Sequence, residues 1–314
     1  MKLEEALTRP PLARRAGVLD FIGDDDGDYC ANFGLQWTRF RSVQLDSVSG
    51  SQESHQRFVS ETGWHPDELR GKVLLDAGCG SGRFAEVALE LGARVIAVDM
   101  SEAVHACHRS LERFPRENWL VLRADVLNLP LRREAFDGVY SLGVVHHTPD
   151  PLKAVRVLAS FVRPGGRLAV WVYERRSPDF TVIQPRRWIR SMTRRWSDQR
   201  KLRMARVLTL VGFPIGWALS RFGRTGERVA HFLPYAARHH LAPHDFSRQW
   251  TYSLMDTFDW YGPRYELPQC ESDVMAAMHV AGLRQVRRLG EARGMAIVGE
   301  APANEPAATR EPVE

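Results

Sequence analysis

The chain has 314 residues, 44% of them hydrophobic and 26% charged, so it is long enough for one large domain or for a domain with a substantial insertion. The net charge of +5 permits contact with anionic substrates, nucleic acid or a membrane surface, without requiring any of these partners. The four cysteines include no Cys-x-x-Cys pair, which argues against a structural zinc site or a disulfide framework and makes a cytoplasmic location the expectation.

Residues 1–69 are expected to form an N-terminal arm ahead of the main fold. The first residues lack the apolar core of a signal peptide, and nowhere does the chain reach the ~18 uninterrupted apolar residues of a membrane span. Four acids lie within residues 24–28, but their spacing does not follow a calcium loop, so a solvated turn is favoured over a metal site. The aromatic residues of segment 33–40 are consistent with an amphipathic helix docked on a sheet.

Segment 70–175 alternates short apolar runs with helical patterns, which predicts an α/β core. Segment 271–300 adds a last helix, ended by a glycine, and a closing hairpin. The expected strands are 73–76, 94–99, 119–123, 136–141, 167–172, 285–289 and 295–299, and the expected helices are 82–91, 101–114, one from about 151, and 272–281. Residues 301–314 have the composition of a disordered tail.

Between these parts, residues 176–270 form an insertion that is expected to be mostly helical. A basic stretch is followed by an apolar segment, 207–219, in which Gly212, Pro214 and Gly216 are expected to interrupt the helix. Residues 186–219 have two interpretations: peripheral contact with an anionic membrane, or a helical cover over the active site. We favour the cover, with the arginines solvated, pairing within a homodimer, or binding an acidic or phosphate-bearing substrate.

The segment that organises the core is 73–82 together with 95–99. An apolar run ends in Asp76, passes through glycines at alternate positions into a helix, and is followed by a second apolar run ending in Asp99. This is the pattern of a nucleotide-binding strand–turn–helix–strand unit. The glycines alone also fit the dinucleotide fingerprint, but Asp76 would repel a pyrophosphate and attract a cationic ligand.

At this point the sequence resembles the class I S-adenosylmethionine (SAM)-dependent methyltransferases, whose Asp-x-Gly-x-Gly-x-Gly motif matches Asp76, Gly78, Gly80 and Gly82. The resemblance implies a Rossmann-like seven-stranded sheet with its last strand antiparallel, an N-terminal lid, and a helical insertion after the fifth strand. It implies SAM as cofactor and S-adenosyl-L-homocysteine (SAH) as product.

The same resemblance assigns the cofactor contacts. Gly78, Gly80 and Gly82 bring the backbone to the ligand, Asp76 acts on its ammonium group, and Asp99 accepts the ribose hydroxyls. The remaining expected contacts are to adenine and to the methionine moiety, and they come from Met100, Asp125, Val126, Leu142 and Gly143. For Asp125 the alternative is a cap on the following turn.

The segment 141–151 is similar to the Leu/Val-His-His-x-x-Asp-Pro segment of ubiquinone- and menaquinone-type methyltransferases, at the point where the acceptor meets the methyl group. His146 and His147 are therefore the candidate catalytic residues, since a histidine can take a proton near neutral pH. The alternative is that one of them caps the next helix or bonds to backbone.

Two further segments are similar to methyltransferase sequences. Residues 33–37 match a Phe-Gly-x-Gln-Trp segment found ahead of the core in enzymes of bacterial natural-product and glycan pathways, which implies a lid in which Trp37 and Phe40 exclude water. Residues 256–265 resemble an Asp-x-x-x-Pro-Arg-Tyr-like stretch, which makes Tyr261, Arg264 and Tyr265 candidates for substrate contact. Core packing is the alternative for both segments.

No metal site is expected. The acidic cluster of catechol-type methyltransferases is not apparent, and the histidines at 231, 239, 240 and 244 lack accompanying cysteines or well-spaced carboxylates. The Asn/Asp-Pro-Pro-Tyr/Phe motif of amino-group methyltransferases is also absent from the sequence, which makes nucleic acid an unlikely substrate.

The sequence thus predicts methyl transfer to O, N or C of a small or medium organic molecule, such as a biosynthetic intermediate. The alternatives are an RNA or protein methyltransferase and a SAM-binding protein without transfer activity.

Overall fold

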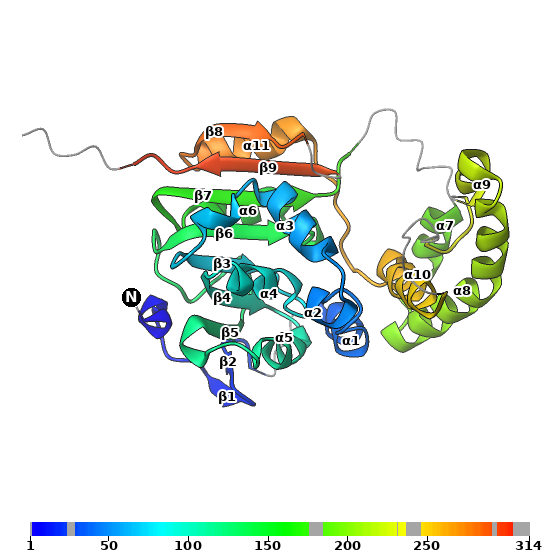
Figure 1. Ribbon diagram of the computed structural model, residues 1–314, viewed down its shortest axis with the longest axis horizontal. Coiled ribbons are helices and arrows are strands. Elements are labelled where there is room, and N and C mark those ends of the chain that lie inside the picture. The colour runs from blue at the N-terminus through cyan, green and yellow to red at the C-terminus, as the bar shows by residue number, and fades with distance from the viewer. Residues whose placement is uncertain are drawn as a thin grey trace, which may run out of the picture.

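A single nine-stranded sheet forms the centre of the protein (Figure 1). The computed structural model describes residues 2–23, 29–175, 185–230, 232–236, 246–290 and 294–303. The strand order is β1-β2-β5-β4-β3-β6-β7-β9-β8. The strands are β1 (Ala13–Arg15), β2 (Val18–Asp20), β3 (Val73–Ala77), β4 (Arg94–Asp99), β5 (Trp119–Arg123), β6 (Phe136–Leu142), β7 (Val162–Val172), β8 (Arg284–Arg288) and β9 (Met295–Glu300).

Helices cover both faces of this sheet. One apolar cluster joins the sheet to α6 and α11, and a second joins its other face to α3, α4 and α5. Consecutive residues of β3 therefore serve opposite faces: Leu74 belongs to one cluster and Leu75 to the other. The helices are α1 (Ala31–Arg39), α2 (Asp46–Ser49), α3 (Glu53–Thr62), α4 (Arg83–Glu90), α5 (Ala103–Leu111), α6 (Pro151–Ala159), α7 (Pro185–Thr193), α8 (Asp198–Ser220), α9 (Gly223–Ala230), α10 (Phe246–Tyr261) and α11 (Glu271–Val280), and the 3-10 turns are η1 (Leu3–Ala6), η2 (Pro66–Glu68), η3 (Arg116–Asn118) and η4 (Val145–His147).

The predicted α/β class is confirmed, and the seven expected strands lie side by side from β5 to β8. Strands β5, β4, β3, β6 and β7 are parallel, and β9 runs antiparallel between β7 and β8. This order places the carboxyl ends of β3, β4 and β6 along one edge of the sheet, where ligands of open α/β folds bind.

The expected count of seven strands was too low, because the N-terminal arm contributes two more. Strand β2 pairs in parallel with β5, and β1 folds back on it through a turn in which Ala16 and Gly17 have positive φ. Asp20, at the end of β2, lies 3.4 Å from the guanidinium of Arg123, and both side chains are buried. Strands of three residues carry too little alternation to be recognised from sequence.

Both outer strands of the sheet carry arginines. Strand β1 holds Arg14 and Arg15, whose side chains are more than half exposed. At the opposite edge β8 holds Arg284, Arg287 and Arg288. Arg288 pairs at 2.8 Å with two carboxylates, those of Glu174, just after β7, and of Glu271 in α11. Charged, short outer strands disfavour pairing with another chain.

Helix α10 lies between the α/β core and the long helix α8 (Figure 1). The expected interruption of α8 was wrong: it runs unbroken over 23 residues with Pro214 inside. Gly212 is needed for close packing, because a Cβ at this position would lie 2.3 Å from the ring of Tyr235. A proline removes only one backbone donor, and packing against α10 offsets that loss.

The outer face of α8 exposes apolar side chains between basic ones. Val207, Leu210 and Val211 are each about 60% exposed. Among the described residues, α8 is the one helix long and apolar enough to cross a membrane by length and composition, with one third of its apolar window buried. Contact of residues 186–219 with a membrane stays a prediction.

Candidate functional site

The turn between β3 and α4 forms the floor of the site. Gly78, Gly80 and Gly82 all have positive φ (96°, 52° and 88°), a conformation that L side chains rarely adopt. A Cβ on Gly78 would lie 2.3 Å from a methyl group of Val144. The amide of Gly78 donates to the carbonyl oxygen of Val98 at 2.7 Å, which ties the turn to the end of β4. The three glycines therefore permit a backbone path that no other residue fits well.

Asp99 stands at the end of β4 beside this turn. One carboxylate oxygen accepts from the amide of Gly80 at 3.0 Å, and the other accepts from the amide and the hydroxyl of Ser101 at 2.9 and 2.7 Å. Burial raises the pKa of this carboxyl above its ordinary value, while these hydrogen bonds act in the opposite sense. Both oxygens are held in fixed directions. Oδ1 already accepts two hydrogen bonds, so the remaining acceptor capacity for a ligand hydroxyl lies on Oδ2.

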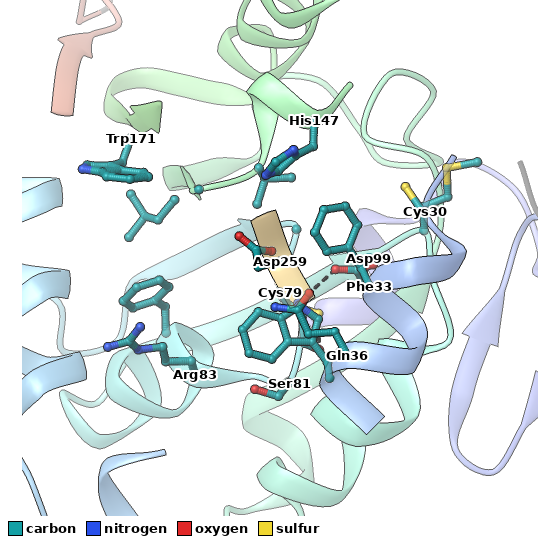
Figure 2. Close-up of a pocket in the computed structure, with 18 of the residues that line it drawn as sticks. Cys30, Phe33, Gln36, Cys79, Ser81, Arg83, Asp99, His147, Trp171 and Asp259 are labelled. Atoms are coloured by element: carbon teal, nitrogen blue, oxygen red, sulfur yellow. Dashed lines mark hydrogen bonds between the residues drawn. The ribbon is translucent and has the colours of Figure 1, made fainter. Parts of the chain in front are cut away.

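A cavity of about 260 Å³ opens above the turn and Asp99 (Figure 2). Helix α1 closes it from one side: Trp37 lies over Gly80, where a Cβ would approach the indole nitrogen to 3.1 Å. Of the expected cofactor contacts, the lining includes Gly78, Gly80, Asp99, Met100, Val126, Leu142 and Gly143.

Three expected cofactor residues do not line the cavity. Asp76 is 2% exposed behind the turn, and its Oδ2 has no hydrogen-bond partner among the described residues. Its burial raises its pKa to about 8. Gly82 lies at the start of α4 and packs against Cys107 of α5. Asp125 accepts the amide of Leu127 at 2.9 Å, as a turn cap does, and the hydroxyl of Tyr29 at 3.3 Å.

The structure distinguishes the two adjacent histidines. His146 is fully buried and stacked on Tyr173 at 4.0 Å, and neither ring nitrogen has a partner in the described chain. His147 lines the cavity, and its Nδ1 lies 2.8 Å from the carbonyl oxygen of Tyr265. Since a carbonyl only accepts, Nδ1 carries the proton and Nε2 is left as an acceptor. Burial lowers the pKa of His147 to about 4, so its ring is neutral at physiological pH.

Replacing His146 by phenylalanine is expected to stabilise the fold increasingly as the pH falls from about 7 to about 5. Burial holds the pKa of His146 well below 6.5, so the folded state keeps the ring neutral while the unfolded chain takes up a proton. The free energy that the neutral His146 ring contributes to the stability of the parent protein is therefore lost as the pH falls. Melting temperatures of both proteins across this range measure the effect. The same change at His65, whose side chain is 69% exposed, serves as control. An offset that does not vary with pH would contradict the assignment.

The expected substrate residues are scattered. Trp37 lines the cavity, whereas Phe40 belongs to the apolar cluster under α8 and α10. Tyr261 is 1% exposed and donates its hydroxyl proton to the carbonyl oxygen of Pro234 at 2.9 Å. Tyr265 contributes its backbone to His147, and Arg264 faces a different cavity. The packing interpretation therefore fits Phe40 and Tyr261 better than substrate contact.

The cavity also contains side chains that the sequence did not suggest. Asp256 and Asp259 enter it from α10, and their spacing of three residues puts both on one face of that helix. Burial and the neighbouring Asp256 and Glu266 raise the pKa of Asp259 to about 7. The remaining newly found lining residues are Tyr29, Cys30, Phe33, Gln36, Gln44, Arg57, Cys79, Ser81, Arg83, Phe84, Val144, Thr148, Trp171, Tyr173 and Trp260.

The described residues contain no group of three or more histidine, cysteine or acidic side chains able to hold a metal ion. The acidic run 24–28 and the histidines at 231, 239, 240 and 244 lie outside the described residues.

Comparison with known proteins agrees with the geometry. Residues 75–170 match a family model described as "Methyltransferase domain". The tRNA U34 carboxymethyltransferase of Desulfotalea psychrophila is 30% identical over 130 residues, covering 40% of this chain and 39% of that protein. The ubiquinone biosynthesis O-methyltransferase of Stutzerimonas stutzeri is 35% identical over 106 residues, covering 32% of this chain and 44% of that protein.

In both pairs the matched segment spans less than half of the relative's own length. Among solved structures, Burkholderia thailandensis 1,6-didemethyltoxoflavin-N1-methyltransferase has a TM-score of 0.47 and 17% identity, with 95% of this chain and 94% of that chain covered. The matched family segment contains β3 with the glycine turn, β4 with Asp99, and the histidine segment after β6. Residues 75–170 of the α/β core are therefore similar to a methyltransferase domain.

Proposed function

We propose that this protein transfers the methyl group of SAM to an oxygen, nitrogen or carbon atom of a small or medium organic molecule. The observation that carries the proposal is the composition of the single cavity above β3 and β4. It joins the glycine turn and Asp99 to a chamber of aromatic and acidic side chains beside Trp37. A cofactor subsite and an acceptor subsite in one enclosed space are what group transfer requires.

The cofactor subsite fits SAM. A Cβ at Gly78 would collide with Val144, so the turn keeps its backbone open to a ligand, and Oδ2 of Asp99 keeps acceptor capacity at the strand end. Asp99 would hold the ribose hydroxyls, Met100 and Val126 the adenine, and the backbone at Gly78 and Gly143 the methionine moiety. When bound, the cofactor supplies an electrophilic methyl group on a sulfonium. The residues of this chain orient it and exclude water.

The acceptor subsite is a chamber with aromatic walls and two carboxyl groups. Phe33, Trp171 and Tyr173 present flat apolar surfaces, and Asp256 and Asp259 of α10 line the same cavity. Such walls fit a planar or partly apolar acceptor. Asp259 has a pKa of about 7, close to the ideal for a residue that removes a proton from a hydroxyl or amine at neutral pH. We assign Asp259 that role, with His147 Nε2 as a second hydrogen-bond acceptor.

The first experiment is calorimetric titration with SAH of the parent protein and of Asp99→Ala. Loss of one or two charge-assisted hydrogen bonds, each worth about 1.5–3 kcal/mol, predicts an affinity at least about ten-fold weaker. Replacement of the exposed Asp67 is the matched control, because its side chain is 92% exposed. Unchanged binding in Asp99→Ala would refute the ribose assignment.

A second candidate is an RNA acceptor. Its support is the basic stretch of α7 and α8 together with the relatives named for tRNA. An RNA affinity that falls steeply with salt would favour it, because each neutralised phosphate releases counterions. Incubation with labelled SAM and candidate acceptors distinguishes both from a protein that binds SAM without transfer. Cytoplasmic location and homodimer formation remain predictions.

A further inference from the structure

A second cavity, of about 970 Å³, lies where the start of α8 and the end of α7 meet α1 and the turn after α10. It is distinct from the cavity above Asp99, and one residue, Tyr29, lines both. Helix α10 packs on α7 and α8, and the space is open to solvent on the side of the exposed Arg194 and Arg195.

The charges around this cavity are strongly unbalanced. Arg194, Arg195, Lys201 and Arg264 line it, against one acid, Asp198. Asp198 lies 3.4 Å from Lys201, so it offsets one of the four positive charges. Among the described residues, Arg194 and Arg195 form no ion pair. Arg194 and Arg195 therefore give the cavity two positive charges that no described carboxylate pairs with.

Not every arginine of the basic stretch contributes free charge to the cavity. Arg190, one helical turn before Arg194, is bonded elsewhere. Its guanidinium donates to the carbonyl oxygens of Trp260 and Pro263 at 2.8 and 2.7 Å and pairs with Glu266 at 3.2 Å. Arg190 thus fixes the turn after α10, whereas Arg194 and Arg195 are directed to the cavity.

Two buried donors complete the wall. Lys201 is 6% exposed, and its ammonium lies 3.1 Å from the carbonyl oxygen of Gly262. Asn32 is 3% exposed on the other side of Gly262, and its Nδ2 has no hydrogen-bond partner among the described residues. A buried amide donor without an acceptor is unfavourable, so its presence beside a cationic cavity indicates an acceptor that the described residues do not supply.

We propose that this second cavity binds a phosphate-type anionic group carried by the methyl acceptor. The proposal rests on the proposed methyl transfer and specifies its substrate class. Adjacent residues of α1 serve the two sites, since Asn32 lines the second cavity and Phe33 the first. An acceptor that extends past Tyr29 would place its anionic group among the arginines and its nucleophile beside Asp259. Arginine forks bind the oxygens of phosphate in pairs, and a tetrahedral anion can use Lys201 and Asn32 together.

The test is calorimetric titration of the full chain with inorganic pyrophosphate at constant ionic strength. Saturable binding is expected, and Arg194→Gln/Arg195→Gln should weaken it about ten-fold or more, since two charge-assisted donors are lost. The control is Arg203→Gln/Arg206→Gln, two exposed arginines of α8 outside the cavity. It removes the same charge and should change the affinity about two-fold or less.

Asn32→Leu removes the amide donor at similar volume and is expected to weaken pyrophosphate binding without lowering the melting temperature. Absence of saturable binding, or equal losses in the two arginine pairs, would overturn the proposal. So would an RNA oligonucleotide that binds far more tightly than pyrophosphate with a salt slope of several phosphates. SAH titration of the same samples separates the two proposals: intact SAH binding without pyrophosphate binding refutes the anion site alone.

Discussion

Replacing Gly78 by alanine is expected to abolish measurable SAH binding, whereas the same replacement at Gly71 is expected to leave binding intact. Both glycines have positive φ, 96° and 76°, so both variants share the cost of about 1 kcal/mol of placing a side chain in that conformation. Only at Gly78 does the new Cβ meet an obstacle, a methyl group of Val144 at 2.3 Å. At Gly71 the described structure has nothing within 4 Å.

The difference in SAH affinity between the two variants measures the effect of the steric clash in the turn, because both variants carry similar backbone strain. Calorimetric titration with SAH measures it, and a melting curve for each variant verifies that the fold is retained. Adding Val144→Ala to Gly78→Ala should restore part of the affinity, because it removes the obstructing methyl groups. Equal SAH affinity in Gly78→Ala and the parent protein would mean that the turn does not contact the cofactor.

Asp259→Asn is expected to lower methyl transfer about a hundred-fold or more near neutral pH, within the range for loss of a positioned proton acceptor. The parent protein's rate should rise with pH through about 7, as Asp259 ionises. In the variant this rise should disappear. Transfer of label from SAM to the identified acceptor, followed over pH, measures both effects; a rate profile with the same midpoint in the variant would assign the proton to another group.

The same substitution has an expected effect on stability that requires no acceptor. Burial raises the pKa of Asp259 from 3.8 to about 7, so its contribution to stability is present at low pH and is lost as the pH rises through about 7. Asp259→Asn should therefore melt at a higher temperature than the parent above about pH 7. The gain should shrink as the pH falls. The exposed Asp67→Asn should show no such trend.

The central strands of the core were predictable because they are mostly short apolar runs bounded by turn residues, as β3 and β4 illustrate. The glycine turn and Asp99 could be identified because their chemistry lies within one short segment. Strands β1 and β2 could not, since three residues set no period. Much of the cavity lining was missed for a different reason: Arg57, Trp171 and Asp259 come from three distant segments and meet only through tertiary packing.

For the histidine pair, the sequence motif predicts the position of the side chains but not their orientations. Sequence places His146 and His147 correctly at the end of β6, but their orientations depend on neighbours far along the chain. Tyr173 stacks on one ring, and the carbonyl of Tyr265 bonds to the other. Asp256 and Asp259 are three residues apart, so the sequence could place them on one helix face. Only the position of α10 shows that this face lines the cavity.

The arginine-bearing outer strands have a consequence for handling the protein. The outer strands β1 and β8 of an open nine-stranded sheet could each pair with a strand of another molecule and start a fibre. Such a strand would have to approach the guanidinium groups that β1 and β8 carry. Repulsion between like edges keeps molecules apart in dilute buffer and weakens as salt is added. Concentrated stocks should therefore be more prone to ordered self-assembly in high salt than in low salt, the reverse of the usual advice for basic proteins.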